Sequence, residues 1–192
     1  MATKVIVGLG NPGSQYARTP HNVGFEAIDA LANRHHCALR RSFRFRARIG
    51  KGSIAGHNVL LVKPVAFMNN SGPVVAAIMR KTGTAIQDLT VITDDADLPV
   101  GQLRIRARGG SGGHKGMQSL LDHLGQEAFP RIRVGIGRNE YQTDLVTYVL
   151  TPLAATAWKE MEPIIQSTAD AVDFLLEHGA DAAMNAFNKR HV

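Results

Sequence analysis

Five short stretches of the chain carry polar side chains of the kinds that take part in hydrolysis. Each stretch lies beside a glycine-rich turn or at the predicted end of a strand, where a rigid scaffold usually presents catalytic groups. Histidine, carboxylate and amide groups of this kind could together activate a water molecule. The stretches are GNPG with Asn11, TPHN with His21, FMNNSG with Asn69, TDDADLP with Asp94, and GGSGGHKG with His114 and Lys115.

A hydrolase assembled from these groups would use water as its nucleophile. No serine is predicted to act as a nucleophile, and Cys37 lacks the surroundings of a reactive thiol. A neutral histidine is the natural base near pH 7, and a carboxylate beside it would orient the ring and raise its pKa. Asparagine amides could donate hydrogen bonds to the oxyanion that develops on the substrate.

Each of these residues also has a purely structural interpretation. Asn11 could cap a turn, Asn69 could cap a helix, and a surface position is the default for a histidine such as His21. The aspartates of TDDADLP could bind a metal. However, Asp94 and Asp95 point to opposite faces if the strand continues, and no His or Glu follows at ligand spacing. We therefore expect no metal.

The stretch IVGLGNPG has the Gly-x-Gly-x-x-Gly spacing of a dinucleotide-binding loop. In that motif the helix begins inside the glycine loop, and an acidic residue ends the second strand about twenty residues later. Here the helical pattern begins only near Asn22, and the nearest acid, Asp29, falls inside that helix. We therefore expect no nucleotide cofactor. The glycines instead indicate a sharp turn that brings Asn11 close to a ligand.

The hydrophobic pattern predicts strands mixed with helices along a single domain, residues 1–192. Strands are expected at 4–9, 43–51, 57–63, 89–93, 103–107, 131–136 and 145–150. Helices are expected at 22–35, between the Asn-Ser pair at 70–71 and Gly83, at 117–124, 153–178 and 181–189. Because hairpin-like pairs occur among the strands, we expect an α/β fold with a mixed, twisted sheet surrounded by helices.

Charge is unevenly distributed along the chain. The formal net charge is +6, but residues 1–138 hold 19 Lys/Arg and 8 Asp/Glu, whereas residues 139–192 hold 3 and 8. A basic body of this kind favours a polyanionic partner. No apolar run is long enough to span a membrane, no signal peptide is recognised, and a single cysteine suits a reducing compartment. We therefore expect a cytoplasmic protein that does not bind membranes.

Arginines alternate with apolar residues in three of the predicted strands, RFRARIG, LRIRAR and RIRVGIG. Period-two alternation buries the apolar face and exposes guanidinium groups such as those of Arg104, Arg106 and Arg133. Like charges side by side cost stability unless a phosphate backbone offsets them, which favours nucleic acid as the partner. The arginine faces carry no interleaved aromatic residues, so we expect contacts to the backbone rather than base stacking.

Five motifs together resemble the bacterial-type peptidyl-tRNA hydrolase family, and they span essentially the whole chain. They are IVGLGNPGSQYARTPHNVGF, VKPVAFMNNSG, DDADLPVGQLRIR, GGSGGHKG and RIRVGIG. The resemblance implies a monomeric, single-domain enzyme that cleaves the ester between a peptide and the terminal ribose of tRNA, without a metal or cofactor. Its partner would be peptidyl-tRNA, bound through the acceptor stem and the 3′ end.

The resemblance also implies roles for individual residues. His21 matches the catalytic base and Asp94 its carboxylate partner, while Asn11 and Asn69 match amides that hold the ester and water. The residues assigned to the substrate-binding cleft are Tyr16, Met68, Asn69, His114 and Lys115. Arg106 and Arg133 match basic positions that hold the terminal phosphate of tRNA, and Arg104 is placed with them.

Two residues depart from the family pattern. Pro20 stands where a basic residue usually precedes the catalytic histidine, and Lys115 stands where an asparagine is usual. A charged Lys115 could donate to an oxyanion or a phosphate, or it could lower activity. Two rival functions stay open at this point: a non-catalytic RNA-binding relative, which would have a spoiled site, and a nucleotide-dependent oxidoreductase.

Overall fold

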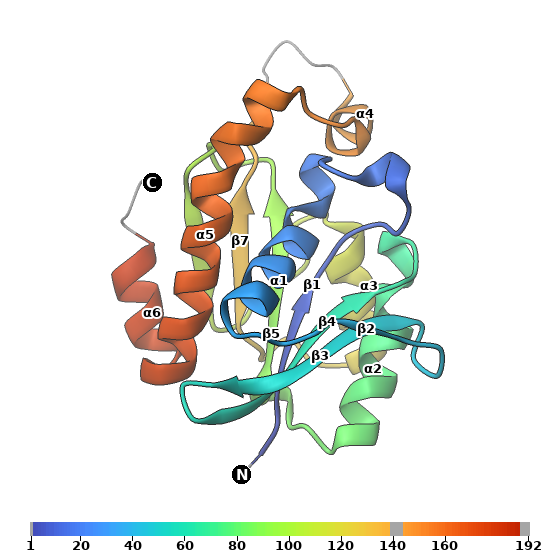
Figure 1. The fold of residues 1–192 in the computed structure, drawn as a ribbon, viewed down its shortest axis with the longest axis vertical. Helices are drawn as coiled ribbons and strands as arrows, with labels where there is room; N and C mark the ends of the chain where they lie inside the picture. The colour runs from blue at the N-terminus through green and yellow to red at the C-terminus, as the bar shows by residue number, and fades with distance from the viewer. Residues whose placement is uncertain (1, 139–143, 189–192) are drawn as a thin grey trace.

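The structure, a computed structural model, describes residues 2–138 and 144–188. Within these ranges seven strands form one sheet with the order β2-β3-β4-β1-β5-β7-β6 (Figure 1). β4, β1, β5 and β7 run parallel, while β2–β3, β3–β4 and β6–β7 pair antiparallel, which confirms the predicted mixed α/β sheet. The strands are β1 (Lys4–Gly8), β2 (Arg40–Ser42), β3 (Ala47–Ile54), β4 (His57–Pro64), β5 (Leu89–Asp95), β6 (Leu103–Arg106) and β7 (Arg131–Gly135).

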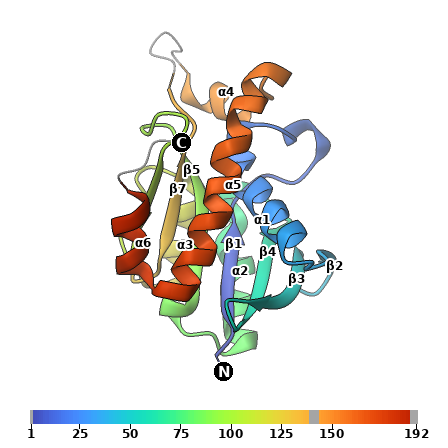
Figure 2. The ribbon, with the colours of Figure 1, turned by 60° about the vertical axis from the view of Figure 1, so that its left-hand side comes forward.

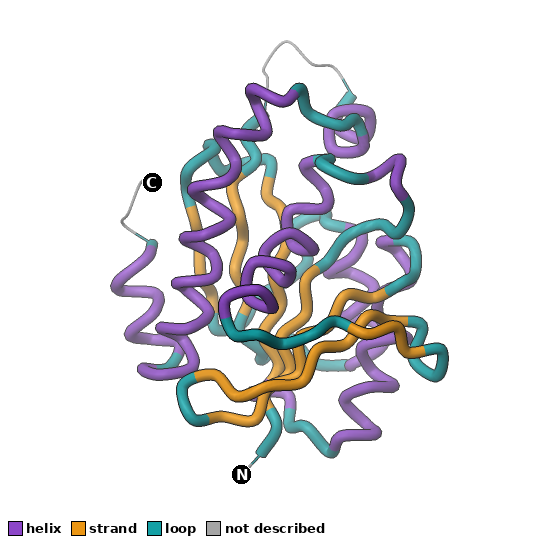
Figure 3. The backbone as a smooth tube through the Cα atoms, in the orientation of Figure 1, coloured by secondary structure: helices purple, strands orange, loops and turns teal. Residues whose placement is uncertain are grey.

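Helices cover both faces of the sheet, as Figures 2 and 3 show. The chain places α1 (Val23–Arg34), α5 (Ala155–His178) and α6 (Ala180–Phe187) on one face, and α2 (Ser71–Thr82) and α3 (Lys115–Leu124) on the other. Along β1, Ile6 joins the core under α1 and α5, whereas Val5 and Val7 join the core under α2 and α3. A strand buried on both faces is apolar throughout, which is why β1 reads as a continuous hydrophobic run.

The glycines at the end of β1 allow the strand to pack closely against α1. A Cβ atom on Gly8 would lie 2.0 Å from the carbonyl oxygen of Gly24 in α1, so only glycine fits there. The chain then passes through two 3-10 turns, Ser14–Tyr16 and Pro20–Asn22, before α1 begins at Val23. The helix N-terminus therefore lies outside the glycine loop, as the sequence predicts, and the geometry of a dinucleotide site is missing.

Residues 145–150 form the helix α4 (Leu145–Leu150), so the strand predicted there is wrong. The Asp144 carboxylate accepts hydrogen bonds from the backbone N–H groups of Val146 and Thr147 and thereby caps the helix. This cap satisfies donors that a helix N-terminus otherwise leaves free, and it outweighs the strand propensity of valine and threonine. α4 packs against the 3-10 turn Pro20–Asn22, above the ends of the strands in Figure 1.

The strand predicted at 43–51 is also wrong in its first half. β3 begins at Ala47, residues 43–46 form a turn, and the short unpredicted strand β2 precedes that turn. Arg46 adopts a left-handed backbone with φ of 49°, which extended strand geometry does not allow. The alternating arginine and apolar residues of RFRARIG therefore do not lie on a single strand. Phe43, the first residue of the turn, is 79% exposed.

The C-terminal helices follow the prediction closely. α5 is continuous over 24 residues with Pro163 inside it, and α6 corresponds to the predicted 181–189, although position 189 lies outside the described residues. None of the helices in the described ranges is both long enough and apolar enough to cross a membrane.

Candidate active site

A cleft of about 710 Å³ opens at the carboxyl ends of the parallel strands β1 and β5. Ligands of open α/β sheets bind at this edge, so the cleft lies where the fold would place one. Arg104, on β6, is the predicted site residue that does not line the cleft. Those that do are Asn11, Tyr16, His21, Met68, Asn69, Asp94, Arg106, His114, Lys115 and Arg133.

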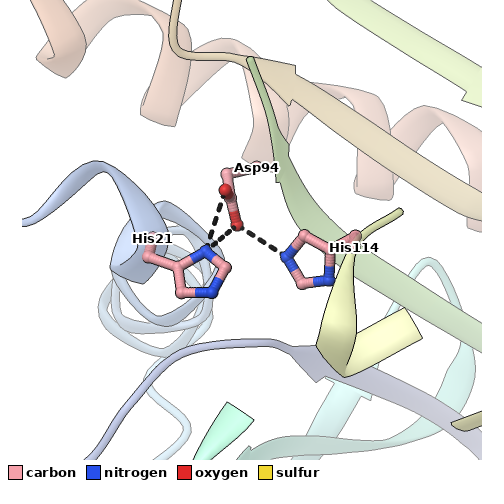
Figure 4. A group of neighbouring side chains, drawn as sticks. All are labelled: His21, Asp94 and His114. Carbon is pink, nitrogen blue, oxygen red and sulfur yellow. Dashed lines mark hydrogen bonds and ion pairs between the residues drawn. The ribbon is translucent and has the colours of Figure 1, made fainter. Parts of the chain in front are cut away.

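His21 and Asp94 meet in this cleft although they are far apart in the chain. His21 lies on the 3-10 turn that Pro20 begins, and Asp94 lies buried near the end of β5. The His21 Nδ1 atom is 2.9 Å from each of the two carboxylate oxygens of Asp94 (Figure 4). Pro20 suits the first position of such a turn because its φ is already helical, so the departure from the family pattern is compatible with this geometry.

The Asp94 carboxyl group is ionised. Burial alone would raise its pKa, but interactions with the rings of His114 and His21 outweigh burial and hold the pKa well below its usual range. An ionised carboxylate can only accept hydrogen bonds. Both histidine nitrogens that face Asp94 must therefore carry a proton.

The tautomer of His114 is also fixed by the hydrogen bonds of its second ring nitrogen, Nδ1. Its Nδ1 atom accepts hydrogen bonds from the backbone N–H groups of Gly116 at 3.1 Å and Met117 at 3.2 Å, which makes His114 the N-cap of α3. An accepting nitrogen carries no proton, so the proton of the ring is on Nε2. That atom lies 2.9 Å from Asp94 Oδ1 and donates to it.

The same argument defines the free nitrogen of His21. Since Nδ1 donates to Asp94, the neutral His21 ring has an unprotonated Nε2. Nε2 points away from Asp94 in Figure 4, and none of the described residues hydrogen-bonds to it. The arrangement can therefore accept a proton from a molecule in the cleft, which is the chemistry of a general base.

Asn11 is buried, and its backbone and side chain are both held in place. The Asn22 side chain accepts from the Asn11 N–H at 2.7 Å and donates to the Asn11 carbonyl at 3.0 Å. Asn11 Oδ1 accepts from the Met68 backbone N–H at 2.8 Å, so Nδ2 is the polar group left to face a ligand. Asn69 follows on the 3-10 turn Met68–Asn70 and is exposed there. The sequence analysis assigned no role to Asn22. Its position directly after His21 was the signal that could have identified it as part of the site.

Three of the arginines that line the cleft are accessible to a ligand, and one of them, Arg108, is exposed just beyond the end of β6. Arg106 is exposed at the end of β6, and Arg133 on β7 is half-buried. Arg133 Nε lies 2.6 Å from a carboxylate oxygen of Asp95, the residue that follows Asp94 on β5. The ion pair holds the Arg133 guanidinium by its Nε side, so that its terminal nitrogens can still donate to an anion.

Arg131 is buried, so the prediction that the arginines of RIRVGIG share an exposed face is wrong for this residue. Its guanidinium donates to the backbone carbonyl oxygens of Gly109, Gly110 and Glu127. The strand alternation is as predicted, but the glycine loop before α3 folds over this end of β7. Arg131 therefore anchors the loop that leads to His114.

The wall formed by α4 was also missed. Leu145, Val146, Val149 and Leu150 line the cleft together with the polar residues, and Leu145 and Val146 are exposed. Because the segment was predicted as a strand, the sequence analysis did not place it near His21. The cap at Asp144, an aspartate before an apolar run, was the signal that could have found this helix.

The match to known proteins extends over nearly the whole chain, and not only over the cleft. The family model described as peptidyl-tRNA hydrolase matches residues 5–192. The chain belongs to this family. Hydrolysis of peptidyl-tRNA is the activity of the family, and membership makes the chain an enzyme of the hydrolase class.

Individual peptidyl-tRNA hydrolases match along their full length. The enzyme from Moorella thermoacetica is 46% identical over 185 residues, which cover 96% of this chain and 97% of that protein. The one from Synechocystis sp. is 40% identical over 192 residues, covering 100% and 99%. The crystal structure of the peptidyl-tRNA hydrolase from Acinetobacter baumannii matches with a TM-score of 0.91 at 32% identity, covering 98% of this chain and 96% of that one.

A metal site at the centre of this peptidyl-tRNA hydrolase fits poorly with its hydrogen bonds. His21, Asp94 and His114 bring ligand atoms within 4.8 Å of one another, as a metal site would. However, the facing nitrogen of each ring carries a proton, and metal ligation requires an unprotonated nitrogen. A metal would have to shift the proton of His114 to Nδ1, and the cap of α3 would then be lost.

The lowered pKa of Asp94 predicts how stability depends on pH. A carboxyl group whose pKa falls on folding adds stability that is complete above the unfolded-state pKa of about 3.9 and is lost as pH falls towards the folded-state pKa. Urea unfolding of the wild type and Asp94→Asn at pH 5 and 3 should show a smaller wild-type advantage at pH 3 than at pH 5. An advantage that grows at pH 3 would contradict the assigned charge.

Proposed function

We propose that this chain hydrolyses the ester of peptidyl-tRNA with a water molecule activated by His21. Nε2 of His21 takes a proton from the water as the water oxygen attacks the ester carbonyl. The tetrahedral intermediate then collapses, the bond to the 3′ oxygen of the ribose breaks, and the proton on Nε2 passes to that oxygen. The ionised Asp94 carboxylate stabilises the imidazolium that exists between these steps. The observation that carries this mechanism is the donation from Nδ1 to Asp94, which leaves Nε2 free.

The oxyanion of the intermediate would be held by amide groups. Asn11 contributes Nδ2, because its Oδ1 already accepts from the Met68 N–H. Asn69 lines the cleft from the neighbouring turn. Asn22 holds the buried Asn11 backbone, and the Met68 N–H holds the Asn11 side chain through Oδ1. The amide is therefore oriented before substrate binds, which reduces the reorganisation that the reaction requires. Tyr16, Met68, His114 and Lys115 would complete the pocket for the ester end of the substrate.

The tRNA would bind through its acceptor stem and 3′ end to Arg106 and Arg133, with Arg104 nearby on β6. Arg133 supports this proposal best, because its guanidinium is oriented by an ion pair with Asp95, the residue that follows Asp94 on β5. The tRNA phosphate and the catalytic carboxylate are then positioned by one strand, β5. Lys115 is exposed at the first turn of α3 and adds a further cation to this side of the cleft.

Replacing Arg106 by serine should weaken substrate binding without slowing chemistry. We expect KM for peptidyl-tRNA to rise about tenfold, the size of one hydrogen bond to a charged group, with kcat nearly unchanged. The slope of log KM against log salt should become shallower by about one, because one phosphate contact is lost. Lys159→Ser, which removes one charge from the exposed side of α5, is the matched control. A fall in kcat with KM unchanged would place Arg106 in the chemistry instead.

We further propose that the enzyme acts in the cytoplasm as a monomer without metal or cofactor. The test is release of free tRNA from N-acetyl-aminoacyl-tRNA, with unblocked aminoacyl-tRNA as the control and a parallel reaction containing EDTA. We expect rapid release from the blocked substrate alone, at the same rate with EDTA. Intact blocked substrate would favour the non-catalytic RNA-binding alternative, and inhibition by EDTA would contradict the metal-free mechanism.

A further inference from the structure

One half of the protein carries positive charge with no carboxylates near it in the sequence. The 58 residues between Asp29 and Asp88 hold ten Lys/Arg and no Asp/Glu. They form the end of α1, the strands β2, β3 and β4, and α2, which is the half of the sheet opposite β6. Arg34 and Lys63 are paired in the fold, Arg34 with Asp170 and Asp173 and Lys63 with Asp29. A solvated surface normally mixes both signs, so the excess of cations that stays after this pairing suits a polyanionic partner.

The turn between β2 and β3 concentrates this charge beside aromatic rings. Phe43 is 79% exposed, and the Arg41 guanidinium lies 4.8 Å from the centre of its ring. Arg44 lies 5.6 Å from the Phe45 ring, and Arg46 is exposed on the same turn. The turn therefore combines flat apolar surfaces with cations that can reach phosphates, which are the two elements of a single-stranded nucleic-acid site.

A groove of about 340 Å³ continues from this turn. It is lined by Arg44, Phe45 and Arg46 on one side and by the start of α2 and Phe67 on another. Phe67 is itself 58% exposed. A volume at the lower end of ligand pockets suits one extruded base rather than a duplex.

We propose that this aromatic–arginine turn, residues 41–46, binds unpaired RNA on a surface that adjoins the catalytic cleft at Phe67. Phe43 stacks on a base, while Arg41, Arg44 and Arg46 donate to the phosphates on either side of it. The sequence analysis expected no base stacking on the arginine faces of the predicted strands. Phe43 precedes RFRARIG, and because the chain turns at 43–46 its ring lies in solvent beside these arginines. An isolated exposed phenylalanine needs no explanation, but one surrounded by three unopposed arginines does.

The RNA bound here differs from the acceptor stem of the substrate. β2, which leads into the turn, and β6, which carries Arg104 and Arg106, are the two edge strands of the sheet. Six spacings between neighbouring strands of ~4.8 Å each, about 29 Å in total, therefore separate them. The catalytic cleft lies between them, at β1 and β5. Because the turn lies on the opposite side of the cleft from the proposed phosphate contacts, we assign it to a second RNA strand.

The test is binding of a fluorescent twelve-nucleotide oligouridine, followed by anisotropy, together with peptidyl-tRNA hydrolysis by the same proteins. Phe43→Leu should weaken oligouridine binding about tenfold, the effect of one lost stacking contact. The triple variant Arg41→Ser, Arg44→Ser, Arg46→Ser should also lower the slope of log Kd against log salt by about two. Hydrolysis should change less than twofold in both, which also shows that they fold, and Lys159→Ser should bind as the wild type does.

Three outcomes would overturn the proposal. Unchanged oligouridine affinity in the triple variant would show that the turn does not bind RNA. A tenfold loss of kcat/KM for peptidyl-tRNA would assign the turn to the substrate site instead of a second strand. Loss of binding to anionic lipid vesicles or to an oligoglutamate peptide, with oligouridine binding retained, would identify a partner other than RNA.

Discussion

The His21→Ala variant is expected to bind peptidyl-tRNA normally and to hydrolyse it 10²–10⁴-fold more slowly than the wild type. His21 makes its hydrogen bonds to Asp94 alone among the described residues, and its free Nε2 is the atom that would accept the proton from water. Removing the ring leaves the oxyanion donors and the arginines in place, so the loss should fall on kcat. Single-turnover hydrolysis and filter binding of the same tRNA separate the two effects.

His21→Gln is the matched control for this variant. Glutamine can still donate a hydrogen bond to Asp94 and fills a similar volume, but its amide does not act as a base near pH 7. It should therefore retain the stability of the wild type and share the rate loss of His21→Ala. Turnover above one tenth of the wild-type rate in either variant would remove His21 from the proposed mechanism.

Local signals were enough to predict the elements that carry the site. α2 ends where predicted because Gly83 takes up the left-handed conformation with φ of 65°, which a non-glycine residue would adopt at a cost. β1 was recognised from its run of apolar residues, and α1 from its amphipathic repeat. These elements flank Asn11 and His21, but the pairing of His21 with Asp94 was implied by the resemblance to the family and not by these local signals.

Contacts that depend on the path of a loop could not be predicted in this way. The glycines of GGSGGHKG indicate freedom, but they do not say that His114 turns back to cap α3 and to donate to Asp94. Arg131 illustrates the same limit, since its alternation with apolar neighbours was correct and the loop over it was not foreseen. Hydrophobic periodicity and secondary-structure propensity predict the conformation of a segment. The roles of His114 and Arg131, in contrast, depend on the path that the glycine loop takes in the folded protein.

Replacing Asp94 with asparagine is expected to slow hydrolysis by the same order as the loss of His21, about 10²–10⁴-fold. The His114 proton is fixed on Nε2 by the cap of α3, so the carbonyl oxygen of the new amide must accept from His114. Its NH2 group then takes the place of Oδ2, 2.9 Å from His21 Nδ1. Because a protonated Nδ1 would repel this NH2 group, we expect Nδ1 to accept a hydrogen bond from it. The proton of the His21 ring moves to Nε2, and the nitrogen that faced water as a base becomes a donor.

The tautomer of His21 is the readout that separates this explanation from a simple loss of charge. In ¹⁵N NMR spectra the His21 ring should carry its proton on Nδ1 in the wild type and on Nε2 in Asp94→Asn, while tRNA affinity is unchanged. Combining Asp94→Asn with His21→Ala should cost little more than either change alone, because the two residues act as one unit.

His114→Asn offers a way to reverse the effect. Asparagine also caps helices, so α3 should stay intact, but it no longer fixes which end of the amide at position 94 faces His21. In the Asp94→Asn, His114→Asn double variant the amide is free to turn its oxygen towards His21, and the proton can return to Nδ1. We expect the wild-type tautomer and a faster rate than in Asp94→Asn alone, still below the wild type because the negative charge is missing. A double variant slower than Asp94→Asn, with His21 still protonated on Nε2, would show that His114 does not control the base.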